Sequence, residues 1–188
     1  MTASTLVRPA RAYLAAYADA LRRGWSPDTT VRGPKTAAEQ LAAIGKDPDA
    51  FLASLDRRDP QGATIELPDG SHVPRLPGFA RWIWDGDLAG SINLRWQPGT
   101  PELPPHVLGH IGYSVVPWKR RRGHASRALA LILDEARAVG LDRVELTADL
   151  DNLASHRVIV ANGGIEVGHF ARPPQYGGGQ HILYRIAL

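Results

Sequence analysis

Residues 113–125 place the end of a strand, a proline, four cations, a glycine and the start of a helix in immediate succession. They read Tyr-Ser-Val-Val-Pro-Trp-Lys-Arg-Arg-Arg-Gly-His-Ala. The first turn of a helix carries N–H groups without intrahelical partners and a partial positive charge. A phosphate binds well at such an end, and a glycine beside it lets the backbone approach the ligand. The run therefore predicts an anion site built from main chain and supplemented by cationic side chains.

The segments that follow this run predict a βαβ unit. Apolar residues recur at spacings of three and four over 124–139, which indicates a helix with one buried face. Alternation of Val144, Leu146 and Ala148 with polar residues indicates a strand over 143–148. A strand, a helix and a strand within about 35 residues imply a parallel pair and a right-handed crossover. Phosphates commonly bind at the strand-to-helix turn of such a unit.

Upstream of the run, the chain predicts three strands in an antiparallel meander. Residues 79–84 alternate as strands do, an Asp-Gly-Asp turn follows, and 88–96 forms the partner strand. A proline-rich loop over 98–105 leads to a third strand at 106–116. Downstream, we expect three further elements: a helix over 152–161 and strands at 165–170 and 182–187.

The first part of the chain predicts helices and irregular backbone. A helix is expected over 9–24, and a second one is capped by Thr36 with Glu39 as its capping-box partner. A third helix is expected near 49–57. The proline- and glycine-rich stretch 59–78 predicts an irregular segment with a short strand at 63–67.

Taken together, these elements predict one domain over 1–188, with a helical and irregular part at 1–78 and a sheet core at 79–188. The expected fold class is α/β (α+β): a mixed, mostly antiparallel sheet with one βαβ crossover and helices on both faces.

Composition removes several classes of function. The chain has no cysteine, so disulfides, thiolate nucleophiles and cysteine metal sites are excluded. Its net charge of +3 is too small to imply nucleic acid by itself. No apolar run is long enough to span a membrane, so we expect a cytoplasmic protein without a membrane partner. The G-x-G-x-x-G, P-loop, G-x-S-x-G and H-E-x-x-H motifs are absent as well.

The run at 113–125 resembles the cofactor motif of the GNAT superfamily of acetyl-CoA-dependent N-acetyltransferases. That motif has Val-x-Pro followed by Arg/Gln-x-x-Gly-x-Gly/Ala, and this chain matches it with Val115, Pro117, Arg120, Gly123 and Ala125. A second match is Asn152-Leu-Ala-Ser155 with the helix stop at 162–164, within a resemblance that covers 79–170. The sequence of residues 109–115 is similar to that of a bacterial subgroup of predicted acetyltransferases whose acceptor is not assigned.

The resemblance implies an acetyl-CoA site and no metal. The N–H groups of residues 121–126 would bind the pyrophosphate of coenzyme A, and residues 113–116 would pair with its pantetheine arm. An N–H near Val115 would polarise the thioester carbonyl, and Asn152 would contact the cofactor or cap its helix. The expected cofactor-binding residues are Ser114, Val115, Val116, Arg120, Arg121, Arg122, Gly123, His124, Ala125, Ser126, Asn152 and Ser155.

The usual acid and base of the family have no counterpart in this chain. Ile159 stands where many members have a tyrosine, and Thr147 stands where they have a glutamate. His110 is the expected substitute base because it lies on the strand that leads to the cofactor. A histidine bonded only to backbone is the alternative. The other candidates each have an ordinary structural explanation: Asp149, Asp151, Tyr184, His124 and His156.

The sequence therefore predicts an N-acetyltransferase that moves an acetyl group from acetyl-CoA to a primary amine of a small molecule or peptide. Two alternatives stay open: a non-catalytic acyl-CoA sensor, and a nucleic-acid-binding module that uses the cations at 119–122. A homodimer that pairs the final strands of two copies also stays open.

Overall fold

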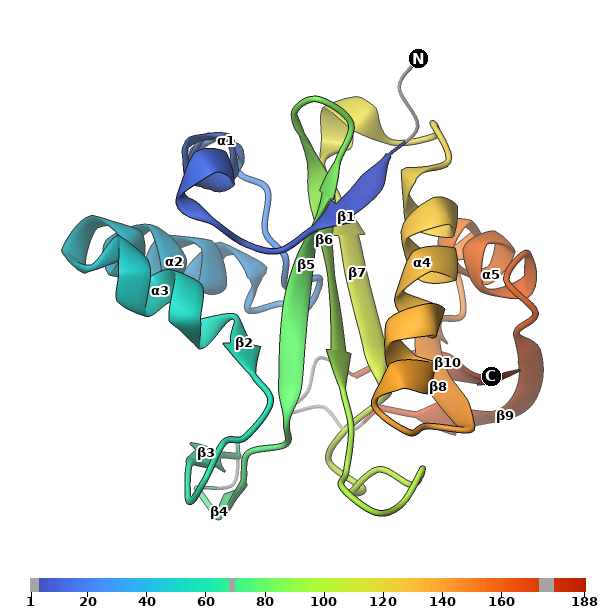
Figure 1. The fold of residues 1–188 in the computed structure, drawn as a ribbon. Coiled ribbons are helices and arrows are strands. Elements are labelled where there is room, and N and C mark those ends of the chain that lie inside the picture. Colours follow the sequence, from blue (N-terminus) through green and yellow to red (C-terminus); the bar gives the residue numbers. More distant parts are fainter. Residues whose placement is uncertain (1–3, 68–69, 173–177) are drawn as a thin grey trace.

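The computed structural model describes residues 4–67, 70–172 and 178–188 (Figure 1). This part of the chain forms five helices, ten strands and one short 3-10 turn. In chain order they are β1 (Thr5–Val7), α1 (Arg11–Arg22), α2 (Gly33–Lys46), α3 (Pro48–Ser54), β2 (Asp56–Arg57), β3 (Thr64–Glu66), β4 (His72–Pro74), β5 (Gly78–Trp84), β6 (Leu88–Arg95), β7 (Ile111–Val115), η1 (Pro117–Lys119), α4 (His124–Ala138), β8 (Arg143–Asp149), α5 (Leu153–Val160), β9 (Ile165–Ala171) and β10 (Gln180–Ala187).

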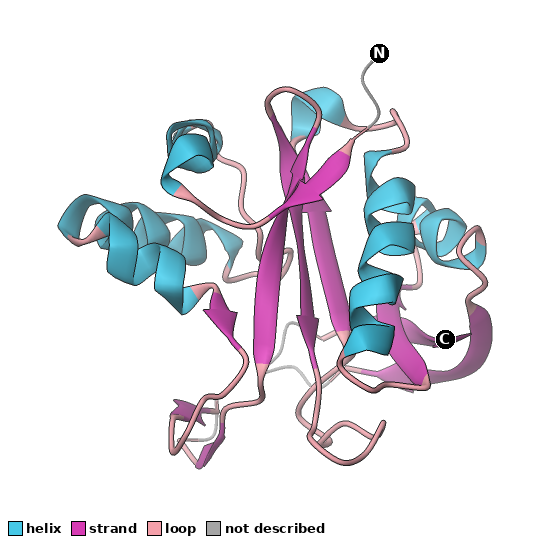
Figure 2. Cartoon of the chain, viewed as in Figure 1, coloured by secondary structure: helices cyan, strands magenta, loops and turns pink. Residues whose placement is uncertain are grey.

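The strands form two main antiparallel sheets. The first has the order β1-β5-β6-β7, with β2 paired to β5, and the second has the order β8-β10-β9. A separate hairpin pairs β3 with β4. Helices α1, α2 and α3 lie on one side of the first sheet, and α4 and α5 lie on the other (Figure 2). The expected α/β class, with mostly antiparallel strands and helices on both faces, is confirmed.

The βαβ segment is present as β7, α4 and β8, but its two strands belong to different sheets. They meet at one end only, where the His110 N–H donates to the Glu145 carbonyl at 2.7 Å. Gly109 permits this approach, because a Cβ there would lie 3.1 Å from the same carbonyl oxygen. The predicted parallel pair is therefore reduced to a junction, and no ladder joins β7 to β8 in the described part of the chain.

Each face of the first sheet buries its own cluster of side chains. Ile83 of β5 packs toward α4 in a cluster that extends to β8 and β10. Its neighbour Trp82 points the opposite way and stacks on Tyr17 of α1, with ring centroids 4.4 Å apart. This alternation is what a strand buried on both faces requires. Packing is therefore the role of Trp82, and Trp84 and Trp96 also contact the two clusters.

Arg81 is a buried cation on β5 whose side chain reaches α4. Its guanidinium donates to both carboxylate oxygens of Glu135, at 3.0 and 2.6 Å, and lies over the Phe79 ring. The side chain is only 3% exposed. A bidentate pair of this kind compensates for the removal of the charge from water.

Several predicted boundaries are wrong for identifiable physical reasons. Helix α2 begins at Gly33, with Pro34 in its first turn, and the Thr36 hydroxyl donates to Asp28 within the helix instead of capping it. The third strand of the meander covers only Ile111–Val115, because residues 106–110 lie outside the ladder with β6. The final strand, β10, has β8 on one side and β9 on the other, so it offers no free edge to a second copy.

No helix among the described residues has the length and apolar character needed to cross a membrane.

Candidate functional site

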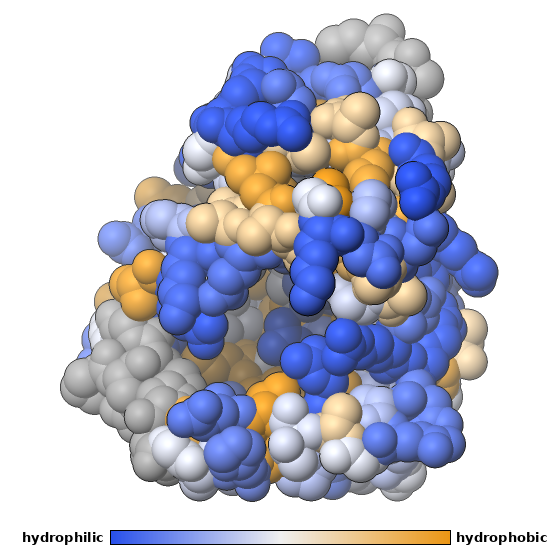
Figure 3. All heavy atoms as spheres, turned by 90° about the vertical axis from the view of Figure 1, so that its left-hand side faces the viewer, coloured by the Kyte–Doolittle hydropathy of each residue, from blue (hydrophilic) through white to orange (hydrophobic). Residues whose placement is uncertain are grey.

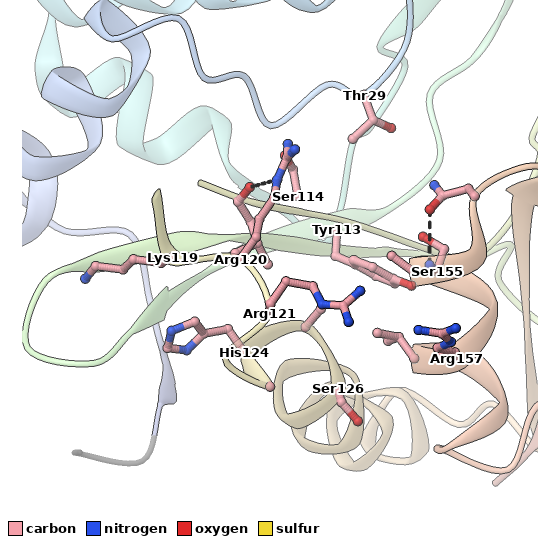
Figure 4. Close-up of a pocket in the computed structure, with 16 residues that line it drawn as sticks. Thr29, Tyr113, Ser114, Lys119, Arg120, Arg121, His124, Ser126, Ser155 and Arg157 are labelled. Atoms are coloured by element: carbon pink, nitrogen blue, oxygen red, sulfur yellow. Dashed lines mark hydrogen bonds between the residues drawn. The ribbon is translucent and has the colours of Figure 1, made fainter. Parts of the chain in front are cut away.

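A cavity of about 550 Å³ lies between the end of β7 and the N-terminal ends of α4 and α5 (Figure 4). The predicted cofactor residues converge on it, with Val116 and Arg122 as the exceptions. The complete lining is Thr29, Tyr113, Ser114, Val115, Lys119, Arg120, Arg121, Gly123, His124, Ala125, Ser126, Asn152, Ala154, Ser155, Arg157 and Val158.

The N-terminus of α4 supplies main-chain donors to this cavity. Gly123 precedes the helix in the left-handed region, with φ of 80°, and Arg121 also has a positive φ, of 62°. The first helical hydrogen bond at this end runs from the Arg127 N–H to the Gly123 carbonyl at 3.0 Å. The N–H groups of His124, Ala125 and Ser126 precede that bond, so no intrahelical acceptor is available to them. This helix start has the donors and the partial charge that bind an anion.

The edge of β7 supplies donors of a second kind. Val115 stands opposite Gly90 of β6, and the next N–H, that of Val116, donates to the Ala89 carbonyl at 3.0 Å. Hydrogen-bonded positions alternate in an antiparallel pair, so the N–H of Val115 points away from β6. Because β7 is the last strand of its sheet, that N–H points toward the gap that separates β7 from β8.

The two exceptions have clear structural causes. Val116 is 0% exposed and packs into the cluster beneath α1 and α2. Arg122 is exposed and lies outside the lining of the cavity. A contact of either side chain with the cofactor is therefore not favoured by this geometry.

The cations of the run are not equivalent. Lys119 is held by the β5–β6 hairpin, with Nζ 2.6 Å from Asp85 Oδ1 and 3.4 Å from Asp87 Oδ2. Partial burial acts to raise the pKa of Asp85, but the hydrogen bond and charge of Lys119, together with the Asp87 N–H and His124, outweigh burial and lower that pKa. Arg120 donates to the Val115 carbonyl at 3.3 Å. The Arg121 side chain extends toward Arg157 of α5, a cation that the sequence analysis missed (Figure 4).

Asn152, Ser155 and Tyr113 meet at the other end of the cavity. Asn152 caps α5, because its Oδ1 accepts the Ser155 N–H at 3.1 Å, and it also lines the cavity. The Tyr113 ring points from β7 toward Ser155 (Figure 4). Burial raises the pKa of Tyr113 and the nearby Ser155 side chain offsets part of that rise, while the buried Tyr113 hydroxyl has no hydrogen-bond partner among the described residues. Two hydroxyl groups therefore lie together where the strand faces the helix.

His110 directly precedes β7, at the end of the strand away from the cavity, and does not line that cavity. It is 0% exposed, and its Nδ1 accepts the Glu145 N–H at 2.9 Å. Burial lowers the pKa of His110, which keeps the ring neutral. A catalytic role for His110 stays a prediction, and these contacts favour the alternative of a histidine bonded to backbone.

The other candidates are also engaged with protein groups. The Tyr184 hydroxyl and His156 Nδ1 are 2.9 Å apart, and His181 Nε2 lies 3.0 Å from Asp149 Oδ1. Burial lowers the pKa of His124, which lines the cavity beside Asp85.

The loop between α1 and α2 closes one side of the site. Trp25 Nε1 donates to the Ser114 hydroxyl at 2.9 Å, and that hydroxyl donates to the Ser26 carbonyl at 2.9 Å. Thr29 of the same loop lines both the main cavity and a second one of about 510 Å³, which Asp149 and Asp151 also border. No sequence signal connected this loop to the run at 113–125, because the contact depends on the tertiary fold.

Among the described residues, no group of three or more histidine, aspartate or glutamate side chains could hold a metal ion.

A split sheet whose gap faces an open helix N-terminus is the arrangement expected for the acetyl-CoA site of an acyltransferase, and the family comparison agrees with it. The model of the acetyltransferase (GNAT) family matches residues 42–163, and the chain belongs to that family. A search of curated protein sequences found no match.

Solved acetyltransferases share the fold at low sequence identity. The ribosomal L7/L12 α-N-protein acetyltransferase RimL, in complex with coenzyme A, has a TM-score of 0.64 and 12% identity over 100% of this chain and 96% of that one. The microcin C7 self-immunity acetyltransferase MccE, in complex with acetyl-CoA and AMP, has a TM-score of 0.62 and 13% identity over 98% of this chain and 92% of that one. RimJ of Mycobacterium smegmatis, in complex with a CoA disulfide, has a TM-score of 0.59 and 20% identity over 98% of this chain and 81% of that one.

Proposed function

We propose that this protein transfers an acetyl group from acetyl-CoA to a primary amine. The observation that carries the proposal is the cavity that joins the open N-terminus of α4 to the free edge of β7. One end suits a pyrophosphate, and the other offers N–H groups to an extended thioester arm. Solved structures of the same fold contain acetyl-CoA or coenzyme A, which supports the choice of donor.

The residues present fit this donor. The N–H groups of His124, Ala125 and Ser126 would hold the pyrophosphate, because Gly123 leaves the approach open: nothing lies within 4 Å of a Cβ placed there. Arg121 and Arg157 would add charge at the rim. The free edge of β7 would bind the pantetheine arm as an additional strand.

Acetyl-CoA supplies the acetyl group, and the protein positions it and stabilises charge. The Val115 N–H would donate to the carbonyl oxygen as charge develops there, an effect worth ~3 kcal/mol in other enzymes. A neutral amine forms the new C–N bond and releases a proton to water, while the C–S bond breaks. The hydroxyls of Tyr113 and Ser155 would donate to the leaving sulfur, since Ile159 is only 1% exposed and has no proton to give.

A pair of glycines on one helix tests the donor site. Gly123 and Gly140 flank α4, have φ of 80° and 90°, and leave the position of a Cβ equally open. Replacing either with valine introduces the same kind of backbone strain, but only Gly123→Val obstructs the proposed phosphate site. Isothermal titration should show acetyl-CoA binding to the wild type and to Gly140→Val, and a loss of at least about tenfold in affinity for Gly123→Val. Absence of binding to the wild type at about millimolar ligand would refute the proposal.

A non-catalytic acyl-CoA sensor is the second candidate. The observation in its favour is that no aspartate or glutamate lines the described part of the main cavity, so a carboxylate base is lacking there. Mass spectrometry with a broad amine panel separates the two functions: acetylated product supports the enzyme, and binding without product supports the sensor. No comparable observation favours nucleic acid, because Lys119 is already paired with Asp85.

A further inference from the structure

A smaller cavity of about 300 Å³ lies against β5 and β6, and the charged residues described in its lining are all cations. Arg57, Arg75 and Arg95 line it, together with His106. No aspartate or glutamate occurs among the described residues of its lining. The remaining lining residues are Ser54, Leu55, Ile65, Pro74, Leu76, Gly78, Phe79, Ala80, Asn93, Leu94 and Val107.

These three arginines differ from the paired arginines elsewhere in the molecule. Arg81, Arg143 and Arg185 each have a carboxylate oxygen within 3 Å of a guanidinium nitrogen. Within residues 4–67, 70–172 and 178–188, no carboxylate lies within 4 Å of the guanidinium groups that line this cavity; Arg95 donates to Asn93 Oδ1 at 3.1 Å.

Within the described residues, few opposing protein charges act on these three exposed arginines. Burial lowers the pKa of Arg75, and the like charge of Arg57 adds to the effect. In the described part of the chain, the carboxylate that acts on Arg95 is that of Asp28, whose oxygens already accept the Thr30 N–H and the Thr36 hydroxyl.

His106 adds a second sign of a missing partner. Its Nε2 is buried and has no hydrogen-bond partner among the described residues, while the ring borders this cavity. Buried polar atoms of this kind are usually satisfied, so an orphan beside a cationic cavity points to a polar ligand there; an anion would accept from Nε2 when that nitrogen carries the proton.

The position of this cavity relates it to the site of acetyl transfer. A Cβ on Gly112 of β7 would lie 3.3 Å from Asn93 Nδ2 and 3.7 Å from an Arg95 nitrogen. Gly112 and Ser114 are two residues apart, which is about 7 Å along a strand and on the same face. That face is the one covered by α1 to α3, opposite the face that Tyr113 and Val115 share with α4. Figure 3 shows this side of the molecule to be hollowed, with hydrophilic residues bordering the hollow.

We propose that the amine acceptor also carries an anionic group, a carboxylate or a phosphate, which Arg57, Arg75 and Arg95 bind while the amine reaches the gap beside β7. This inference rests on the proposed function and adds a substrate class to it. Guanidinium groups suit both anions because their planar donors match paired oxygens. The acceptor is then a molecule or end group whose amine and anion are separated by at least about 7 Å, rather than a simple alkylamine.

Matched amines test the proposal in the acetyl-transfer assay. 6-Aminohexanoate is compared with pentylamine, and 4-aminobutyl phosphate with 4-aminobutanol, so that each pair differs only in the anion and the anionic member is long enough to span about 7 Å. We expect kcat/KM to be at least about tenfold higher for the anionic member of at least one pair, and the pair that responds separates carboxylate from phosphate. Arg95→Ala should remove that preference, while Arg22→Ala, an exposed arginine at the end of α1, should retain it. Equal rates within both pairs would overturn the proposal.

A binding measurement keeps the test decisive if none of these amines is acetylated. The protein is first saturated with coenzyme A, so that added phosphate cannot occupy the donor site. Titration with inorganic phosphate should then shift the Arg57, Arg75 and Arg95 Nε–H resonances in NMR spectra, and these shifts should weaken in Arg75→Ala. Unmoved resonances would refute the anion site. Failure of coenzyme A itself to bind would instead refute the proposed function, so the two failures are distinguishable.

Discussion

Gly90 occupies a position where a single added atom would reach the site. A Cβ on this residue would overlap the Ser114 carbonyl oxygen and would lie 2.9 Å from the Val115 Cα. Both contacts are main chain and cannot rotate away. The position of the β7 edge, and therefore of the Val115 N–H, depends on glycine at this point of β6.

Gly90→Ala should consequently impair both folding stability and donor binding. Overpacking of this kind typically costs ~1–3 kcal/mol. Urea unfolding should show a loss in that range, and titration calorimetry should show weaker acetyl-CoA binding. Gly45→Ala is the control, since nothing lies within 4 Å of a Cβ at that helical position. An alanine at Gly90 that leaves both quantities unchanged would contradict the described contact between β6 and β7.

His110 gives the molecule a pH-dependent stability. Burial lowers its pKa in the folded state below the ordinary value of 6.5, which the unfolded chain retains. The unfolded state therefore binds more protons between these two values, so stability is complete above pH 6.5 and declines as the pH falls through the folded-state pKa. The free energy of unfolding should fall as the pH is lowered below about 6.5, and this contribution should level off below the folded-state pKa of His110.

His110→Asn should flatten this dependence, because its side-chain oxygen can still accept the Glu145 N–H but does not titrate. Replacement of the exposed His72 should leave the slope as it is in the wild type. If His110→Asn retains acetyl transfer with an unchanged pH profile, the residue is structural; loss of an activity limb near neutral pH would restore the catalytic prediction.

At the level of elements, α5 combines a structural cap with a binding wall. The Asn152 oxygen caps the helix, while Ala154, Ser155, Arg157 and Val158 turn toward the cavity at helical spacing. That spacing could have identified Arg157 and Val158 from the sequence, because residues three and four apart share a face.

Asn152→Ala and Asn152→Asp separate the two roles of this residue. Aspartate retains the capping oxygen, so only alanine should lose about 1 kcal/mol of stability in urea unfolding. If the amide nitrogen also contacts the cofactor, both variants should bind acetyl-CoA more weakly. Normal binding by Asn152→Asp would reduce the role of Asn152 to capping.

The long periodic elements were predictable, and the short ones were not. The stripe that begins at His124 and the alternation around Val144 identified α4 and β8 within a residue or two. By contrast, β1 and β2 are held by pairing with β5 rather than by any local pattern. The start of α2 was missed for a similar reason, because Asp28 takes the Thr36 hydroxyl that a capping box would have used.

The same contrast applies to the site. A local motif specified the helix start and the β7 edge, because those groups are adjacent in sequence. Thr29 and the arginines of the smaller cavity come from segments far from that motif, and only the fold brings them together. The residues of the proposed donor site could therefore be named from the sequence, and those of the proposed acceptor site could not.

For the whole molecule, we propose a single domain, because both clusters are built on the same sheet. Trp82 and Ile83 are adjacent on β5 yet belong to different clusters, so neither cluster can be lost without exposing the other face of that strand. Tryptophan fluorescence reports mainly on the cluster around Trp25 and Trp82. Its urea transition should therefore have the same midpoint as the transition followed by far-UV circular dichroism. Separate midpoints would show that the part at 1–78 unfolds independently.

The pleat of β7 directs alternate side chains to opposite sides of the strand. Tyr113 and Val115 face the helices that build the donor site, whereas Gly112 and Ser114 face Trp25, Ser26 and Arg95. Ser54, Arg57 and Arg75 line the smaller cavity but not the main one, so substitutions there would vary the proposed acceptor site and leave the lining of the proposed donor site unchanged. An engineer could therefore explore new acceptors with a library confined to these three positions.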